Sequence, residues 1–255
     1  MDVHGVPSPD DFPSEAYAKV SYLLDTWPNP DGEAWEQARG GWLGVGYRFL
    51  AAATFDEAWR ESLAEGGAAP IPEVRLRQET SLFGFFMAAT AVMDCLSYSA
   101  FGAAALVRPE AFREMLKSET RKRIWTKDVP GRLRAAFPET ALADSLEAAL
   151  GSEGYCQLDR TRNVLAHRLL PSRQHFVDPV TNRLTRPSEW KLDIRGTETV
   201  GMTPAFTAAP RAWLAENLSA LTQDLAVFLR ALKAESEGSA KSPTPAVPRD
   251  EPNGI

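Results

Sequence analysis

Apolar residues recur at helical spacing along most of this 255-residue chain. Trp35, Trp42 and Phe49, for example, are seven residues apart, which places them on one face of a helix. The pattern predicts helices over 14–27, 31–65, 72–108, 138–150 and 210–234, with shorter helical pieces over 109–123 and 130–136. We therefore expect an all-α fold, an up-and-down helical bundle.

Four glycines interrupt the second predicted helix, at positions 40, 41, 44 and 46. Because glycine has no Cβ, such positions either kink a helix or let a neighbouring backbone come close. The sequence leaves both possibilities open.

Residues 82–106 form a run that is long and apolar enough to cross a bilayer. Asp94 at its centre, the polar Ser97 and Tyr98, and many Ala and Gly residues suit a helix enclosed by protein better than one facing lipid. We therefore expect no membrane span. Asp94 itself is either a catalytic carboxylate or, as is commoner, a buried acid satisfied by a hydroxyl group or an arginine.

The remaining segments lack helical periodicity. Residues 172–208 combine turn residues with alternation of apolar and polar positions, which predicts a short hairpin or an ordered loop before the last helix. Residues 1–13 are acidic and proline-rich, and residues 236–255 are polar and proline-rich, so we expect both ends to be disordered. A single helical domain is then predicted over residues 14–235.

Composition narrows the classes of function. The net charge of −6 and the pI of about 5.3 argue against broad attraction to a phosphate backbone, because that attraction scales with the cations offered. Two isolated cysteines, Cys95 and Cys156, are too few for a disulfide framework or a zinc site. The N-terminal residues have neither the basic region nor the apolar core of a secretion signal, so we expect a cytoplasmic protein.

One helix carries most of the candidate chemistry. Gly151 and Ser152 open it, Pro171 closes it, and it reads LDRTRNVLAHRLLP from Leu158 onward. At about 100° per residue, one face of this helix is suited to packing and another is polar and available. The packing face holds Leu158, Thr161, Leu165 and Leu169, and the polar face holds Asp159, Arg160, Asn163 and His167.

Asn163 and His167 are four residues apart, so their side chains are neighbours on the helix surface. The Asn163 amide can therefore hydrogen-bond the imidazole and fix its tautomer, which suits a general acid or base. Arg162 lies about 140° away from His167 around the helix. Its length, or a second chain, must bring its guanidinium to the same phosphate.

Arg162, then four residues beginning with Asn163, then His167 followed by Arg168, resembles the R-x(4–6)-H motif of the HEPN superfamily. These are small helical-bundle proteins of bacterial toxin and phage-defence systems and of RNA processing. The resemblance covers roughly residues 72–235, although only the short motif is residue-specific. It implies a metal-independent endoribonuclease with Arg162, Asn163 and His167 as catalytic residues. It further implies RNA as substrate, a homodimer with the site between protomers, no cofactor, and an antitoxin or regulatory protein as a further partner.

A basic stretch offers RNA a route onto an acidic protein. Residues 113–134 hold eight basic and three acidic side chains. The expected substrate-binding residues are Arg121, Arg123 and Lys127 from this stretch and Arg160 and Arg168 from the motif helix. Trp125 and Trp190 lie in basic segments, where they either stack on unpaired bases or, more commonly, pack into the core.

Other interpretations use the same residues differently. A charged stretch is commonly only a solvated surface, and Arg162, Asn163 and His167 would then cap neighbouring helices and hold a dimer seam. The alternative function is a non-catalytic helical module that binds a partner protein or a nucleotide. No two of His167, His175 and Asp178 share metal-ligand spacing on one helix, so we expect no metal site.

Overall fold

The structure is a computed structural model that describes residues 2–3, 5–28, 30–66, 70–167, 172–181, 183–191 and 199–240. For residues 2, 3, 167, 239 and 240 it describes the backbone alone. Within these limits the chain is mostly helical, and the expected all-α bundle with a hairpin before the last helix is confirmed.

The elements of the described residues follow in chain order. The α-helices are α1 (Ser14–Asp25), α2 (Glu33–Gly66), α3 (Pro72–Val107), α4 (Ser118–Arg121), α5 (Val129–Ala136), α6 (Ala141–Gly151), α7 (Glu153–His167) and α8 (Ala205–Ala240). Two 3-10 turns, η1 (Arg113–Leu116) and η2 (Thr126–Asp128), flank α4. The strands β1 (Asp2–Val3) and β2 (Val6–Pro7) pair with each other, and β3 (Ser172–Val177), β4 (Leu184–Lys191) and β5 (Thr199–Gly201) form an antiparallel sheet in that order.

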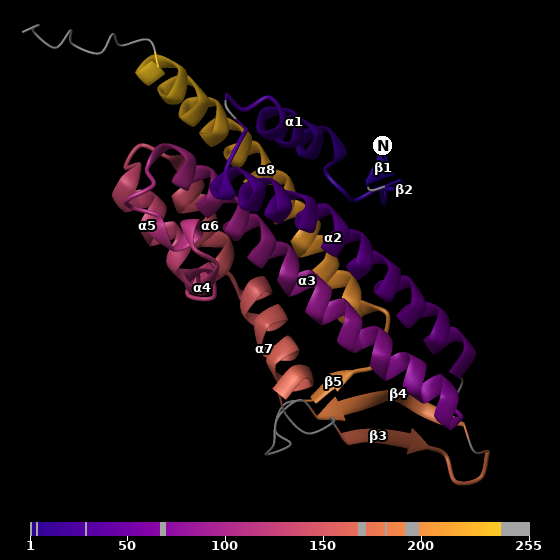
Figure 1. The fold of residues 1–255 in the computed structure, drawn as a ribbon. Coiled ribbons are helices and arrows are strands. Elements are labelled where there is room, and N and C mark those ends of the chain that lie inside the picture. Colours follow the sequence, from indigo (N-terminus) through magenta and orange to yellow (C-terminus); the bar gives the residue numbers. More distant parts are fainter. Residues whose placement is uncertain are drawn as a thin grey trace, which may run out of the picture.

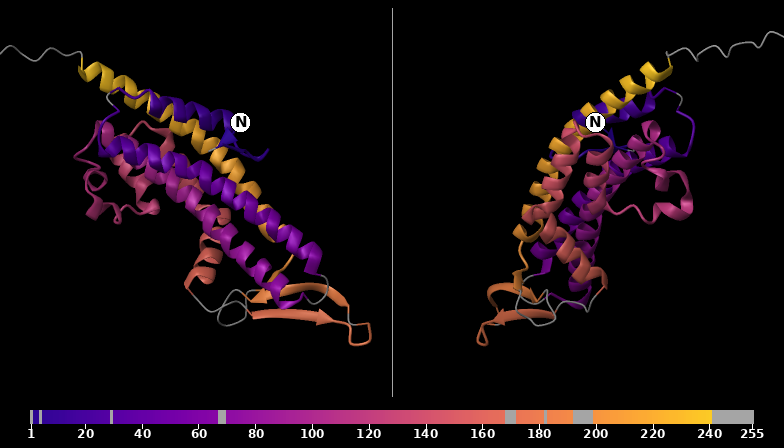
Figure 2. Two further views of the ribbon diagram at one scale, coloured as in Figure 1. Left: turned by 45° about the vertical axis from the view of Figure 1, so that its right-hand side comes forward. Right: turned by 90° about the vertical axis from the view of Figure 1, so that its left-hand side faces the viewer.

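Three long helices form the body of the molecule. The helices α2 and α3 are an antiparallel pair, and α8 runs beside them (Figure 1). Figure 2 shows the short helices α4, α5 and α6 gathered toward one end of this body and the three-stranded sheet at the other end. Between these two ends, α7 packs against α3.

The core is built from the faces that the sequence pattern predicts. Trp42 and Phe49 are almost fully buried, and Trp35 packs against the core from a partly buried position. Trp190 on β4 is also fully buried, so core packing is confirmed for this tryptophan. Trp125, by contrast, is 67% exposed.

Glycines let α2 and α3 approach each other closely. A Cβ on Gly41 of α2 would lie 3.0 Å from the backbone nitrogen of Ser99 on α3. A Cβ on Gly102 of α3 would lie 2.9 Å from the backbone nitrogen and Cα of Ala38 on α2. These distances leave no room for a side chain, so the two backbones touch here. Close approach therefore accounts for Gly41.

The helix α3 is, among the described helices, the one long and apolar enough to cross a bilayer. Of its most apolar window, 61% is buried inside the protein, and α2, α7 and α8 pack around it. That burial is typical of the core helix of a soluble protein, in agreement with what Asp94 and its polar neighbours predict.

Asp11 and Phe12, two residues of the N-terminal segment that we expected to be disordered, contact the bundle. Phe12 is buried against the ring of Phe49, and Asp11 accepts two hydrogen bonds from Arg211 of α8 at 2.7 and 2.8 Å. Arg211 also donates to the fully buried carboxylate of Asp56 at 2.8 Å. Because a buried carboxylate needs a cationic partner, this one arginine ties the N-terminal segment to both α2 and α8.

Two other boundaries differ from the prediction. Residues 109–123 do not form one helix, because Lys117 adopts an extended backbone that separates η1 from α4. The last helix begins at Ala205 rather than Pro210 and runs to Ala240, so residues 236–240 are helical rather than part of a disordered tail. Residues 241–255 of that predicted tail lie outside the described residues.

We expect Gly102→Ala to lower the free energy of unfolding by about 1–3 kcal/mol, because the added methyl group overpacks against the backbone of α2. Gly40 is the matched control, since a Cβ there meets nothing within 4 Å. Gly40→Ala should raise the free energy of unfolding by up to about 1 kcal/mol through helix propensity alone. Urea unfolding followed by circular dichroism measures both, and equal stabilisation by the two changes would contradict the close packing.

Candidate functional site

The packing face predicted for α7 fixes the helix against the bundle. The Ser152 hydroxyl oxygen caps the N-terminus by accepting a hydrogen bond from the Tyr155 backbone at 3.3 Å. Leu158 and Thr161 are fully buried, and Leu165 packs against the core from a partly buried position. The predicted packing face is thus confirmed for these three residues, whereas Leu169 lies outside the described residues.

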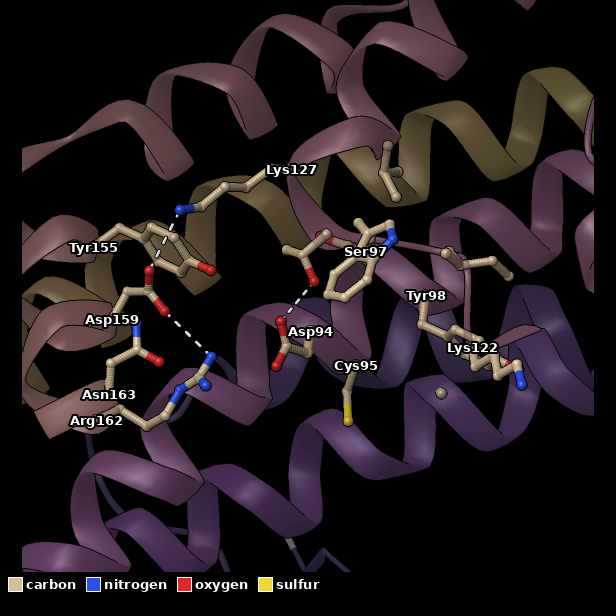
Figure 3. Close-up of a pocket in the computed structure, with 15 residues that line it drawn as sticks. Asp94, Cys95, Ser97, Tyr98, Lys122, Lys127, Tyr155, Asp159, Arg162 and Asn163 are labelled. Carbon is tan, nitrogen blue, oxygen red and sulfur yellow. Dashed lines mark hydrogen bonds and ion pairs between the residues drawn. The ribbon is translucent and has the colours of Figure 1, made fainter. Parts of the chain in front are cut away.

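The polar side of α7 faces a cavity of about 630 Å³. Its walls come from α2, α3, α7 and the segment between α4 and α5, as Figure 3 shows. The polar and aromatic residues of its lining include Asp94, Ser97, Tyr98, Lys122, Trp125, Thr126, Lys127, Tyr155, Asp159, Arg162 and Asn163. This volume lies within the range of small-molecule sites.

Asp159 holds two cations at one end of the cavity. Its carboxylate accepts a hydrogen bond from Arg162 at 3.2 Å through one oxygen and from Lys127 at 3.3 Å through the other. Both pairs are drawn in Figure 3. A guanidinium has five N–H donors, and Arg162 makes no other hydrogen bond to a described residue, so most of its fork is able to donate to a ligand.

Asp94 lies on α3 beside these groups. Its carboxylate accepts a hydrogen bond of 2.5 Å from the Thr126 hydroxyl. Burial raises the pKa of Asp94 above its usual value, the Thr126 hydrogen bond and the charge of Arg162 oppose that rise, and the charge of Asp159 adds to it. The hydrogen bond from Thr126 thus matches the expectation of a buried acid satisfied by a hydroxyl, while Arg162 acts on Asp94 through its charge.

Neutral hydrogen-bonding groups complete this end of the cavity. Asn163 is partly buried, and its side-chain amide makes no hydrogen bond to a described residue. Burial raises the pKa of the Tyr155 phenol, so its hydroxyl stays protonated and can donate. The cavity therefore combines a guanidinium, an ammonium, an amide and a phenol around one space.

The structure brings together only some of the predicted site residues. Arg162, Asn163 and Lys127 line the cavity. Arg160 and Arg123 are exposed and lie outside its lining. Arg121 also lies outside, and its guanidinium is engaged by Glu33 of α2 and by the Met115 carbonyl oxygen at 3.0 Å.

Two predicted residues are described in part or not at all. The backbone of His167 ends α7 one helical turn beyond Asn163, while its side chain lies outside the described residues. Arg168 lies outside them entirely. Among the residues that the structure describes, no group of three or more His, Cys, Asp or Glu side chains is placed to hold a metal ion.

Sequence reasoning missed the partners of Arg162. Asp159 is three residues before Arg162, a spacing typical of side-chain pairs on one helix surface, so the ion pair could have been predicted. Asp94 was seen as a buried acid, but its place beside Arg162 depends on the packing of α3 against α7. The sequence does not indicate that Tyr155 lines a site, because an aromatic residue on a helix commonly packs into the core.

Comparison with protein-family models, with curated proteins and with solved structures finds no match to this chain. What the protein does must therefore be inferred from the cavity itself and from the motif in α7.

Proposed function

We propose that this protein is a metal-independent endoribonuclease of HEPN type in which Arg162, Asn163 and His167 act on an RNA phosphodiester. One observation carries the proposal. Arg162 and Asn163, the two motif residues whose side chains are described, line the same cavity, although they lie on different sides of an ideal helix. They do so beside a third polar group, Lys127, which also suits phosphate.

The chemistry assigns one role to each group. His167 takes the proton from a ribose 2′-hydroxyl, and the freed oxygen attacks the neighbouring phosphorus. Arg162, held in place by Asp159, neutralises the charge that gathers on the pentacoordinate phosphorus. The 5′-oxygen leaves with a proton returned by a histidine. The products are a 2′,3′-cyclic phosphate and a 5′-hydroxyl, and no metal takes part.

The same proposal includes the setting of the enzyme. We place it in the cytoplasm as a homodimer whose two motif helices share one RNA groove. A role as a toxin in bacterial or phage defence follows from the resemblance of the motif, with an antitoxin or regulatory protein as the partner that restrains it. The exposed cations near the cavity, such as Lys122, suit either an RNA or an acidic partner.

A non-catalytic module that binds a nucleotide is the second candidate. The observation in its favour is that Asp159 forms ion pairs with both Arg162 and Lys127 within the chain and offsets part of their charge. Such pairing keeps cations in place for binding, but it also reduces the charge that a transition state would meet. Cleavage assays separate the two candidates.

We expect the purified protein to cleave single-stranded RNA in EDTA and to leave 2′,3′-cyclic phosphate ends. His167→Ala and Arg162→Ala should each lower the cleavage rate by at least about 100-fold, because each removes a group that acts in the transition state. Arg160→Ala is the matched control, since Arg160 lies on the same helix but outside the cavity lining, and it should keep most of the activity. Equal cleavage by wild type and His167→Ala would remove this histidine from the mechanism.

Growth of bacteria that express the protein gives a separate test of the toxin setting. Wild-type expression should slow growth, and Arg162→Ala should relieve the effect at equal protein level, because the guanidinium is required for cleavage. Immunoblotting checks the level, and Arg160→Ala again serves as the control. Harmless wild-type protein would favour the binding module.

Phosphodiester binding should strengthen as the pH falls through the raised pKa of Asp94. The direction of this pH dependence follows from the groups around Asp94, which are Thr126, Arg162, Asp159 and Tyr155. Ionised Asp94 competes with phosphate for Arg162, whereas protonated Asp94 does not, and the raised pKa moves this change above the usual aspartate range.

Fluorescence anisotropy with a labelled 2′-O-methyl oligouridylate measures this dependence. The ligand holds no group that titrates between pH 5 and 8, and the His167→Ala background removes the imidazole of the motif. Asp94→Asn in that background should bind more tightly at pH 7 and show a flatter pH profile. An unchanged profile would mean that Asp94 does not govern the availability of Arg162.

A further inference from the structure

The cavity extends well beyond the motif residues. Figure 3 shows Tyr98 and Lys122 on the far side of Asp94 from Arg162 and Asn163. Trp125 lines the cavity from the same segment as Lys122. A single phosphate at Arg162 would occupy only part of about 630 Å³, so the cavity has room for a second ligand group.

Trp125 presents an unused aromatic surface at this cavity. Its side chain is 67% exposed and makes no hydrogen bond or ring contact with a described residue. Tryptophan is usually buried for most of its surface, and the other large aromatic groups of this protein are mainly in the core. An exposed indole beside a cavity is suited to stacking on a flat ligand.

Ser97 supplies an independent sign of a ligand. The residue is 1% exposed and lines the cavity, yet its hydroxyl oxygen has no hydrogen-bond partner among the described residues. Leaving a buried hydroxyl unpaired is costly, and nearly all such groups in folded proteins have a partner. The hydroxyl is closed to solvent, so a rotation of the Ser97 side chain toward the cavity would let it bond a polar atom of a ligand there.

Lys122 is the third feature of this part of the cavity. Lys122 is exposed, lines the cavity and makes no ion pair with a described residue. Lys127, which lines the same cavity, is already paired with Asp159. Lys122 is therefore the more available of the two lysines for a second phosphate of the same ligand.

From these three features we infer that the cavity holds an unpaired nucleotide adjacent to the scissile phosphate, with its base stacked on Trp125, a polar base edge at Ser97 and its second phosphate at Lys122. The inference rests on the proposed function for the identity of the ligand as RNA. It adds that the substrate must be single-stranded at this step, because a paired base has no free face for the indole.

Binding of 2′-O-methyl oligonucleotides to the full chain tests the inference without cleavage, because these ligands lack the attacking hydroxyl. Trp125→Ala should weaken binding of a single strand by about 5- to 150-fold, the range measured for loss of a stacking aromatic. Trp125→Phe, which keeps an aromatic face, should recover most of the affinity. Lys122→Ala should weaken binding more than Lys117→Ala, the control at an exposed lysine directly before α4 and outside the cavity lining.

Two comparisons identify the ligand. A fully paired duplex should bind wild type more weakly than the single strand and should be insensitive to Trp125→Ala. A mononucleotide that bound as tightly as the single strand would overturn RNA as the ligand, and an unchanged affinity in Trp125→Ala would overturn the stacking site.

The test also separates this inference from the nuclease proposal. If binding depends on Trp125 but the protein cleaves no RNA, the nucleotide site is supported and the nuclease proposal is contradicted. If the protein cleaves RNA and Trp125→Ala leaves the KM unchanged, the nuclease proposal is supported and the nucleotide site is contradicted.

Discussion

Close contact between α2 and α3 is the constraint on which the cavity depends. Gly41 brings the backbone of α2 against α3 at Ser99, and the neighbouring α3 residues Asp94 and Ser97 then face the cavity. The segment between α4 and α5 that covers them begins directly after Arg121 of α4, which is itself tied to α2 because it binds Glu33. Both the floor and the cover of the cavity are therefore positioned by one helix, which explains how a site built from distant parts of the sequence keeps its shape.

The electrostatics of the site are balanced rather than strongly positive. Three cations, Lys122, Lys127 and Arg162, line the cavity with two carboxylates, Asp94 and Asp159. Burial raises the pKa of Asp94, so this carboxylate takes up a proton at a higher pH than an ordinary aspartate does. Asp159 weakens the attraction of the site for anions, but it also holds the Arg162 guanidinium in a fixed orientation.

Local patterns predicted the elements better than their contacts. Helical periodicity was sufficient for the long helices and for the packing face of α7, where Leu158 and Thr161 are buried as expected. It could not place Asp94 beside Arg162, because they meet only through the packing of two helices that are far apart in sequence. Nor could it show that the N-terminal segment is held in place, because Asp11 depends on Arg211, 200 residues away.

The basic stretch between residues 113 and 134 shows why charge counts alone mislead. Four of its eight basic side chains are used inside the protein, in ion pairs of Arg121, Lys127, Arg132 and Arg134. Half of these cations are therefore left to neutralise phosphates, and a bound nucleic acid would release fewer counterions than the count of eight suggests. Affinity must then come mainly from stacking and hydrogen bonding in the cavity, which depend little on salt. The proposed nucleotide site would in this way select an unpaired nucleotide on a protein whose net charge of −6 gives little attraction for nucleic acid in general.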